Sequence, residues 1–159
     1  MSITIRKGTK ADLPQVLNLI KELAQYEKAS QEVTNTVADM EHDGFGKNPI
    51  YSLFIAEEEG EILGIAVYYT KYSTWKGRCI FLDDLIVTES RRSSGIGKKL
   101  FEAVIKVSKA TNANRMEWQV LDWNTQAINF YHKFNATLDA EWINGKFTKE
   151  QLQAYSISQ

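Results

Sequence analysis

Two consecutive runs of β-branched and aromatic residues place the strongest limit on the fold of this chain. The first run covers residues 62–72 and the second covers residues 78–87, with a break at residues 73–77 between them. Runs of this kind are typical of neighbouring strands in a sheet. After a polar loop, apolar residues recur at the helical period, at Leu100, Phe101, Val104, Ile105 and Val107. The order of strand, strand, loop and helix predicts an α/β protein in which these two strands are central.

Shorter elements complete this pattern on both sides of the central strands. Upstream, the sequence predicts a strand at 3–6, a helix capped by Thr9, a weaker helix at 36–42 and a strand at 51–56. Downstream, it predicts a strand at 116–120, a helix from Asn124 or Thr125 to Phe134, and two late strands, near Ala136 and at 142–147. Strands and helices therefore alternate over most of the chain.

The length and the charge balance limit the functions that are open to the chain. Its 159 residues suit a single domain, which we place at residues 1–159. With 19 Lys and Arg against 20 Asp and Glu, the formal net charge is −1. A molecule with this balance has no overall attraction for nucleic acid or for an anionic membrane. We therefore expect neither as a partner.

Features that the sequence lacks set expectations for location and for metal content. No secretion signal opens the chain, and no apolar run approaches the ~18 residues that a membrane helix needs. A cytoplasmic location is therefore expected. Cys79 is the single cysteine, and His42 and His132 have no further ligand residues at suitable spacing. We expect no disulfide and no metal site.

The loop at residues 92–98 carries the clearest chemical signal. It reads Arg-Ser-Ser-Gly-Ile-Gly-Lys between a predicted strand and a predicted helix, where free backbone amides and the helix dipole favour an anion. It does not fit a nucleotide P-loop, because Arg92 replaces the first glycine and Lys99 replaces Ser or Thr. It does not fit a dinucleotide fingerprint, because Leu100 replaces the third glycine. Taken alone, the loop could equally be a glycine-containing helix start without a ligand.

In its context, the loop resembles that of the GNAT family of N-acetyltransferases. It follows residues 81–87, Phe-Leu-Asp-Asp-Leu-Ile-Val, and precedes residues 123–131, Trp-Asn-Thr-Gln-Ala-Ile-Asn-Phe-Tyr. Four further stretches resemble the diamine (spermidine/spermine) acetyltransferase branch of this family: 22–27, 43–46, 72–78 and 121–124. Residues 73–77, Ser-Thr-Trp-Lys-Gly, are most similar to the thialysine-preferring member of that branch. The resemblance covers nearly the whole chain.

The resemblance implies a fold and an assembly. The fold is the acyl-CoA N-acyltransferase fold of the GNAT family, a mixed central sheet of about six to seven strands flanked by about four helices. Relatives in the diamine branch form homodimers, so a homodimer is expected here.

The resemblance also implies that acetyl-CoA is the cofactor and indicates which residues hold it. The pantetheine arm would run as a pseudo-strand along the backbone of Leu85, Ile86 and Val87. The pyrophosphate would rest on the amides that open the helix, where Ser93 stands in place of a glycine common in relatives. Together, the implied contacts outside the strand are Arg92, Ser93, Ser94, Gly95, Ile96, Gly97 and Lys98 in the loop, and Asn124, Thr125, Gln126 and Ala127 further along the chain.

Two side chains are implied as catalytic. Tyr131 falls where the family keeps a tyrosine near the thioester sulfur, as a general acid for the departing thiolate. Asp83 occupies the position of a glutamate that takes the proton from the attacking ammonium, and its shorter side chain favours a water relay. Without the resemblance, Tyr131 would rather be a core residue of its helix, and Asp83 and Asp84 would be solvated acids. Alternation along a strand predicts that these two carboxylates lie on opposite faces.

Further residues are implied as contacts for a cationic substrate. Asp84, Tyr26 and Glu27 match substrate-binding positions of the branch, and Trp75 matches an aromatic wall beside the amine chain. A carboxylate balances an ammonium, and an aromatic face covers its methylenes. Exposed helix-end acids and half-buried tryptophans are also common without a ligand. A last substrate-contacting region aligns with Glu117, Trp118 and Gln119.

The sequence thus predicts an acetyl-CoA-dependent N-acetyltransferase. The acceptor would be a small primary amine, a diamine, polyamine or thialysine-like compound, that attacks directly in a ternary complex. Two alternatives stay open: an acetyltransferase for a protein or antibiotic amine, and a non-catalytic module that senses acyl-CoA.

Overall fold

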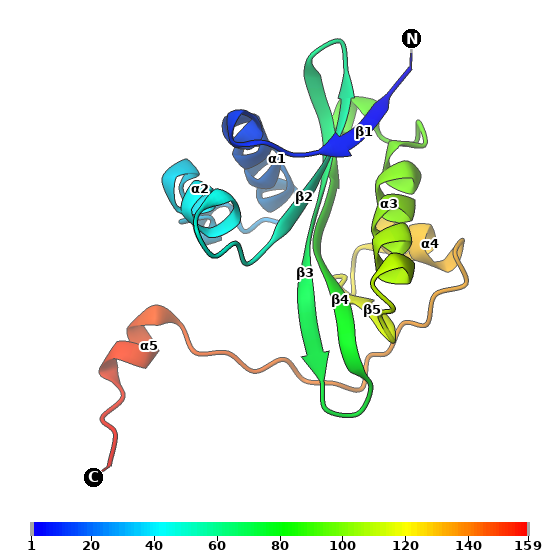
Figure 1. Ribbon diagram of the computed structural model, residues 1–159. Helices are drawn as coiled ribbons and strands as arrows, with labels where there is room; N and C mark the ends of the chain where they lie inside the picture. Colours follow the sequence, from blue (N-terminus) through cyan, green and yellow to red (C-terminus); the bar gives the residue numbers. More distant parts are fainter. Residues whose placement is uncertain (1, 159) are drawn as a thin grey trace. The chain divides into compact units, whose positions relative to one another are not determined.

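The computed structural model describes residues 2–158 and divides the chain into two units (Figure 1). The first unit ends at Gln119 and the second begins at Val120. The first contains the sheet and the helices α1 (Leu13–Tyr26), α2 (Val37–Phe45) and α3 (Ile96–Ala110). The second contains α4 (Thr125–His132) and α5 (Lys149–Ala154).

One mixed sheet forms the centre of the first unit. It consists of β1 (Thr4–Lys7), β2 (Ser52–Glu58), β3 (Glu61–Ser73), β4 (Gly77–Val87) and β5 (Arg115–Trp118), in that spatial order. The first four strands pair antiparallel, whereas β5 runs parallel to β4 after the crossover through α3. Parallel neighbours need such a crossover, and a helix usually supplies it. The prediction of an α/β protein in which these two strands are central is confirmed, since β3 and β4 each have a strand on both sides.

The two late strands predicted near Ala136 and at 142–147 were wrong. No strand forms in the described part of the second unit, and Trp142, Ile143 and Phe147 are exposed there. A strand is stable where a neighbour takes its backbone N–H and C=O groups, and residues 120–158 contain no such neighbour. The described sheet therefore has five strands rather than the six to seven that the resemblance implied.

Capping residues set several helix boundaries. Thr36 precedes α2 and accepts the N–H of Asp39 at 3.1 Å. Thr148 precedes α5, which the sequence pattern did not predict, and accepts the N–H of Gln151 at 3.1 Å. Asn135 follows α4 with a φ of 57°, as expected for a left-handed helix end. With α5, residues 2–158 contain one α-helix more than the resemblance implied.

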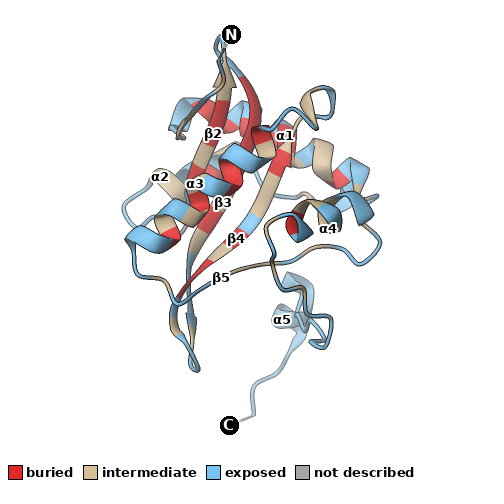
Figure 2. Ribbon diagram, turned by 90° about the vertical axis from the view of Figure 1, so that its right-hand side faces the viewer, coloured by how far each residue is buried: buried red, intermediate tan, exposed pale blue. Residues whose placement is uncertain are grey.

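Helices cover both faces of the sheet. α1 and α2 lie over one face, which we call the α1 face, and α3 lies over the other, the α3 face (Figure 1). Figure 2 shows that the buried residues gather on the strands and on the sides of these helices that face them. Under α1 and α2 the core consists of Leu13, Val16, Leu17, Leu19, Met40, Leu53, Ile55, Ile62, Ile65 and Ile86. This apolar layer follows directly from the predicted periodicity of α1 and the strands.

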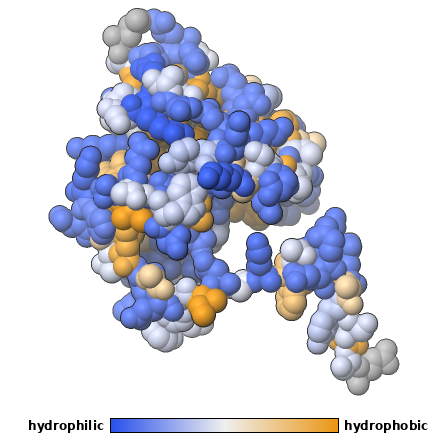
Figure 3. Space-filling view, turned by 180° about the vertical axis from the view of Figure 1, so that it is seen from behind, coloured by the Kyte–Doolittle hydropathy of each residue, from blue (hydrophilic) through white to orange (hydrophobic). Residues whose placement is uncertain are grey.

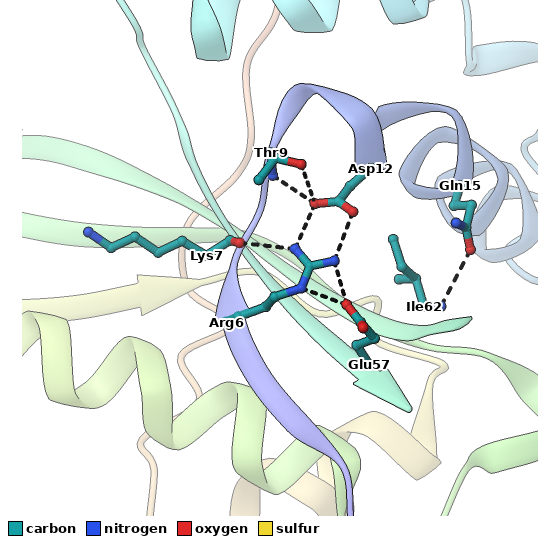
Figure 4. Close-up of polar contacts among 7 residues, drawn as sticks. All are labelled: Arg6, Lys7, Thr9, Asp12, Gln15, Glu57 and Ile62. Carbon is teal, nitrogen blue, oxygen red and sulfur yellow. Dashed lines mark hydrogen bonds and ion pairs between the residues drawn. The ribbon is translucent and has the colours of Figure 1, made fainter. Parts of the chain in front are cut away.

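A buried acid joins the start of α1 to the sheet (Figure 4). Asp12 accepts two hydrogen bonds from the Arg6 guanidinium, at 2.8 and 2.9 Å, and one from the Thr9 N–H at 2.7 Å. Arg6 also donates from Nε to Glu57 on β2 at 2.6 Å. The Arg6 hydrogen bonds are the largest of the effects that lower the pKa of Asp12 to about 2. The network therefore ties β1, β2 and the first turn before α1 together.

Gly64 lets α3 approach β3 closely, and a side chain there should destabilise the fold. A Cβ at Gly64 would lie 2.8 Å from the Ile86 carbonyl oxygen, 3.0 Å from Leu100 Cδ1 and 3.2 Å from Ile96 Cγ2. We expect Gly64→Ala to lower the free energy of unfolding in urea by ~1–3 kcal/mol, because the backbone oxygen cannot move aside cheaply. Gly145→Ala is the control, since a Cβ there meets nothing within 4 Å. An equal effect of both substitutions would contradict this packing argument.

Polar side chains cover most of the face shown in Figure 3, with small hydrophobic patches between them. Among residues 2–158, no helix has both the length and the apolar character that crossing a membrane would require.

Candidate active site

A β-bulge on β4 brings two carboxylates to one face of the sheet. In the pairing of β3 with β4, Val67 lies opposite Asp84 and Tyr68 lies opposite Leu82, so Asp83 is an extra residue without a partner. The extra residue interrupts the alternation of the strand. The expectation that Asp83 and Asp84 point to opposite faces was therefore wrong.

Both carboxylates lie on the α1 face. Val67, the partner of Asp84, packs against the core under α1. Tyr69 lies two residues further along the same face, and burial together with the charge of Asp83 raises its pKa. Glu27, directly after α1, is close enough for its charge to raise the pKa of Asp84. Three acids from β4 and the end of α1 thus meet on this face.

The proton affinity of these acids is unusually high. Burial is the largest of three causes that raise the pKa of Asp84 to about 7, followed by the charges of Asp83 and Glu27. Burial also raises the pKa values of Asp83 and Glu27. A carboxyl group whose pKa is near 7 can take up and release a proton at neutral pH. The cluster is therefore chemically suited to proton transfer.

β4 has an open edge next to this cluster. β5 pairs with β4 only as far as Leu82, which lies opposite Trp118. No strand of the described sheet pairs with this edge at residues 85–87, the predicted pantetheine contacts. The Val87 carbonyl on β4 accepts a hydrogen bond from Arg92 Nε at 3.2 Å. Such an edge can pair with an extended ligand through its backbone groups.

The loop after β4 opens α3 with two left-handed residues. Ser93 has a φ of 63° and Gly95 a φ of 86°, a region that strains most side chains and suits glycine. The Lys99 N–H bonds to the Gly95 carbonyl at 3.2 Å, so the amides of residues 96–98 precede the first helical bond. A Cβ at Gly95 would meet nothing within 4 Å. These amides and the positive end of α3 can hold an anion.

Contacts from α1 hold this loop in place. Glu22 accepts the N–H of Glu89 at 2.8 Å. The Arg92 guanidinium lies over the ring of Tyr26, 5.1 Å from its centroid. Arg92 and Tyr26, predicted as a cofactor and a substrate contact, are therefore neighbours.

Trp75 lies apart from the acids within one chain. It sits in the turn between β3 and β4 and is 82% exposed. Gly77, at the start of β4, is ~20 Å from Asp83 along the strand. The Ser73 hydroxyl accepts the N–H of Trp75 at 3.2 Å and so shapes this turn. The structure brings Tyr26, Glu27, Asp83 and Asp84 into one region of the first unit, but not Trp75.

Glu117 lies on β5 between two cations. Its Oε1 is 3.2 Å from Lys71 Nζ, and its Oε2 is 3.4 Å from Arg115 Nε. It pairs with Phe81 of β4, so both side chains share the α1 face. Glu117 therefore belongs to the same face as the acids of the bulge.

The two neighbours of Glu117 in the predicted set lie differently. The Trp118 ring packs edge-on against Phe101 of α3, with centroids 5.3 Å apart, which places it on the α3 face. Gln119 ends the first unit and is exposed.

The remaining predicted residues lie in the second unit. The Asn124 side chain accepts the N–H of Ala127 at 3.2 Å and so caps α4. Thr125 and Gln126 form the first turn of this helix. Tyr131 is 7% exposed, and its ring centroid lies 5.2 Å from that of Phe130. Asn124 to Ala127 thus form a helix start, and Tyr131 is a buried residue of the same helix.

Several residues that shape the region were missed from the sequence. Glu22 holds the loop, Arg91 pairs with Glu58 at 2.7 Å, and Tyr69 and Lys71 line the α1 face beside the bulge. Their spacing carries no motif, because each contact joins residues far apart in the chain. The alternation of β3 could have placed Tyr69 and Lys71 on one face, but only the strand register shows what lies opposite them.

Comparison with known proteins identifies the family of the chain. Residues 13–136 match the acetyltransferase (GNAT) family. A thialysine N-epsilon-acetyltransferase from Bos taurus is 37% identical over 142 residues, which is 84% of this chain and 84% of the relative. Spermidine/spermine N(1)-acetyltransferase-like protein 1 from Homo sapiens is 34% identical over 158 residues, which is 93% of this chain and 23% of that protein.

Solved structures share the fold at lower identity. An integron cassette protein from the mobile metagenome of V. cholerae superposes with a TM-score of 0.78 at 23% identity, covering 96% of each chain. An aminoglycoside acetyltransferase from a soil metagenome, in complex with sisomicin, gives a TM-score of 0.75 at 18% identity, covering 92% of this chain and 95% of its own. The sequence matches extend over most of the molecule, and they show that the chain belongs to the GNAT family of N-acetyltransferases.

Proposed function

We propose that the protein transfers the acetyl group of acetyl-CoA to a primary amine of a small molecule, by direct attack in a ternary complex. The observation that carries this proposal is the position of the Asp83–Asp84 bulge beside the open edge of β4. Acids that can accept a proton thus lie next to a backbone edge that can align an extended donor. The thialysine and spermidine/spermine relatives support a small amine as the acceptor.

The residues present fit acetyl-CoA. Residues 85–87 offer backbone groups to a pantetheine arm, and the loop from Arg92 to Lys98 offers amides to a pyrophosphate. The open space at Gly95 leaves room for that group. When bound, acetyl-CoA supplies the activated thioester. Asn124, Thr125, Gln126 and Ala127 at the start of α4 are proposed as a second contact region.

Proton movements are assigned to two side chains. A protonated amine has no lone pair for attack, so Asp83 takes its proton through a water molecule, with Asp84 as a second acceptor. Acetyl-CoA, when bound, would supply the acetyl carbon that the free amine attacks, and CoA would leave as the thiol. Tyr131 would donate its phenolic proton to the leaving sulfur, and the second proton that the nitrogen loses on becoming an amide would pass through water to restore the phenol.

The same surface provides proposed contacts for the acceptor. Tyr26, Glu27 and Asp84 bind the ammonium end, where the carboxylates of Glu27, Asp84 and the neighbouring Asp83 balance its charge. Glu117 is a further proposed contact on the α1 face of β5. Trp118, on the α3 face, and Gln119, which follows β5, are also proposed as contacts, but they do not share this surface. Trp75 is also proposed as an aromatic contact for the acceptor. It would reach an acceptor only in an assembly of two chains, where the β3–β4 turn of one chain approaches the acids of the other.

We further propose that the protein is a cytoplasmic homodimer with residues 1–159 as one catalytic domain. The apolar side chains of Trp142, Ile143 and Phe147, exposed in the second unit, support a protein contact surface of this kind. Light scattering of the purified protein tests the assembly, and a monomeric mass at micromolar concentration would contradict it.

An acceptor panel tests the proposed reaction. The purified protein is incubated with acetyl-CoA and, separately, with polyamines, thialysine, lysine analogues and an aminoglycoside, and free thiol is measured. We expect thiol release that depends on a small amine and falls strongly in Asp83→Asn, which leaves Asp84 as the remaining acceptor. Release with the aminoglycoside alone would favour an antibiotic acceptor. A non-catalytic sensor would bind CoA, release no thiol with any amine, and be unaffected by Asp83→Asn.

A further inference from the structure

The loop proposed to hold the CoA diphosphate depends on its two ends for its position. Ser93, Ser94 and Gly95 are exposed, and a Cβ at Gly95 would meet nothing within 4 Å. Segments with so little packing of their own move easily unless neighbouring parts of the chain hold them. Downstream, the buried side chain of Ile96 fixes the start of α3. Upstream, the loop follows the single helical turn Glu89–Arg91, so this turn decides where the amides lie.

A carboxylate from α1 holds the first amide of this turn. The Glu89 N–H has no acceptor within so short a helix, and Thr88 before it supplies no side-chain cap. Glu22 accepts this N–H through Oε1 at 2.8 Å. The Thr88 hydroxyl lies 3.4 Å from Glu22 Oε2. Glu22 therefore takes the place of a cap, although it lies 67 residues away in the sequence.

A second carboxylate, from β2, holds the last residue of the turn. Arg91 Nη1 donates to Glu58 Oε2 at 2.7 Å. This hydrogen bond is the largest of the causes that lower the pKa of Glu58. The side chains of Arg91 and Glu58 are 33% and 19% exposed, so the pair is partly shielded from water. Acids from two different elements thus fix the two ends of one turn.

Both acids lie outside the proposed contacts of the cofactor. A carboxylate repels a diphosphate, so direct contact with either acid would weaken the binding of CoA. The oxygens of Glu22 and Glu58 instead accept hydrogen bonds from the turn. None of the proposed reaction steps uses these two residues. Their contacts therefore indicate a role in holding the loop.

We propose that Glu22 and Glu58 are positioning residues for the cofactor. They act through the turn Glu89–Arg91, which keeps the amides of residues 96–98 aligned for the CoA diphosphate. This inference rests on the proposed function and adds two residues to its cofactor site.

Donors with and without the diphosphate test this role. Acetyl-CoA and S-acetylpantetheine carry the same thioester arm, but only acetyl-CoA reaches the loop. Glu22→Ala and Glu58→Ala should each raise the KM for acetyl-CoA ~10-fold, as expected for the loss of one hydrogen bond to a charged group. The kcat at saturating acetyl-CoA should change little. The kcat/KM for S-acetylpantetheine should stay constant, because this donor makes no contact that the loop provides.

Two further variants separate the hydrogen bond from other effects. Glu22→Gln keeps an oxygen for the Glu89 N–H, so its KM for acetyl-CoA should equal that of the unmodified protein. Glu41→Ala removes a partly exposed acid from α2 and should change neither donor. Alanine favours helices, so Glu22→Ala should preserve α1, and urea denaturation of each variant checks the fold.

Several results would overturn the inference. An unchanged KM for acetyl-CoA in either alanine variant refutes the role of that acid. An equal loss with both donors shows general damage to the site. Glu22→Gln with the KM of Glu22→Ala shows that the charge acts and not the hydrogen bond.

Binding measurements keep this inference separate from the proposed reaction. If no thiol is released with any amine, the proposed function fails, and calorimetric titration with CoA decides this inference. Weaker binding by Glu22→Ala than by Glu22→Gln supports it, and equal binding by these variants and the unmodified protein refutes it. No binding of CoA by the unmodified protein refutes both.

Discussion

Tyr131→Phe is expected to lower kcat about 100-fold or more, which is the range for loss of a general acid. The leaving sulfur would then depart without a proton from the protein. The affinity for CoA should stay constant, because the substitution removes a hydroxyl and no backbone amide. Tyr131 is buried against Phe130, and phenylalanine keeps that ring contact, so the fold should be preserved. Initial rates with the best amine and calorimetric titration with CoA measure the two quantities.

A control of the same chemistry is available in the second unit. Tyr155 is 67% exposed, and Tyr155→Phe should leave kcat and CoA affinity unchanged. If Tyr131→Phe retained full kcat, the assignment of Tyr131 as the acid would be wrong. If it lowered kcat and CoA affinity together, the residue would act in binding and not in proton donation.

Asp84→Asn should change how stability depends on pH. The pKa of Asp84 is about 7 in the folded protein, against an ordinary value of 3.8. Between these values the folded state holds a proton that the unfolded state has lost, so the free energy of unfolding falls as pH rises from about 4 to about 7. The loss is at most ~4 kcal/mol for this group. Asp84→Asn removes this loss of stability. The variant should therefore be more stable than the unmodified protein at pH 8 but not at pH 4.

Other groups near Asp84 do not cancel this effect. Burial raises the pKa values of Glu27 and Asp83, which gives the same sign in the same pH range. Asp12, with its pKa lowered to about 2, affects stability only under more acidic conditions.

Urea denaturation at pH 4, 6 and 8, the values that bracket the predicted window, measures the difference. Glu32→Gln, in an exposed turn of Ser30–Glu32, is the control for the loss of one carboxylate. An identical pH profile for Asp84→Asn and the unmodified protein would show that Asp84 ionises normally.

Local patterns explain which parts of the fold could be predicted. β3, β4 and α3 are long and strongly periodic, so their hydrophobic residues alone indicate their type. The prediction of late strands failed because residues 142–147 have strand-like composition, but no neighbouring strand forms among the described residues of the second unit. α5 was missed because it is short, and its capping by Thr148 and Gln151 is its clearest signal.

The candidate site, like the fold, could be predicted from the sequence only in part. The loop from Arg92 to Lys98 could be predicted because its glycines and the following helix are adjacent in sequence. The bulge at Asp83 could not, because an extra residue is visible only when β3 and β4 are paired. The cations beside Glu117 come from β3 and β5, so only the sheet brings them together.

Amide hydrogen exchange with and without saturating CoA tests the central claim most directly. The claim is that the open edge of β4 and the first turn of α3 hold the cofactor. We predict slower exchange in peptides that cover residues 85–87 and 93–98, and no change in β1 and α2, which lie outside the proposed site. CoA binding without protection of either peptide, or with protection confined to β1 and α2, would contradict the account.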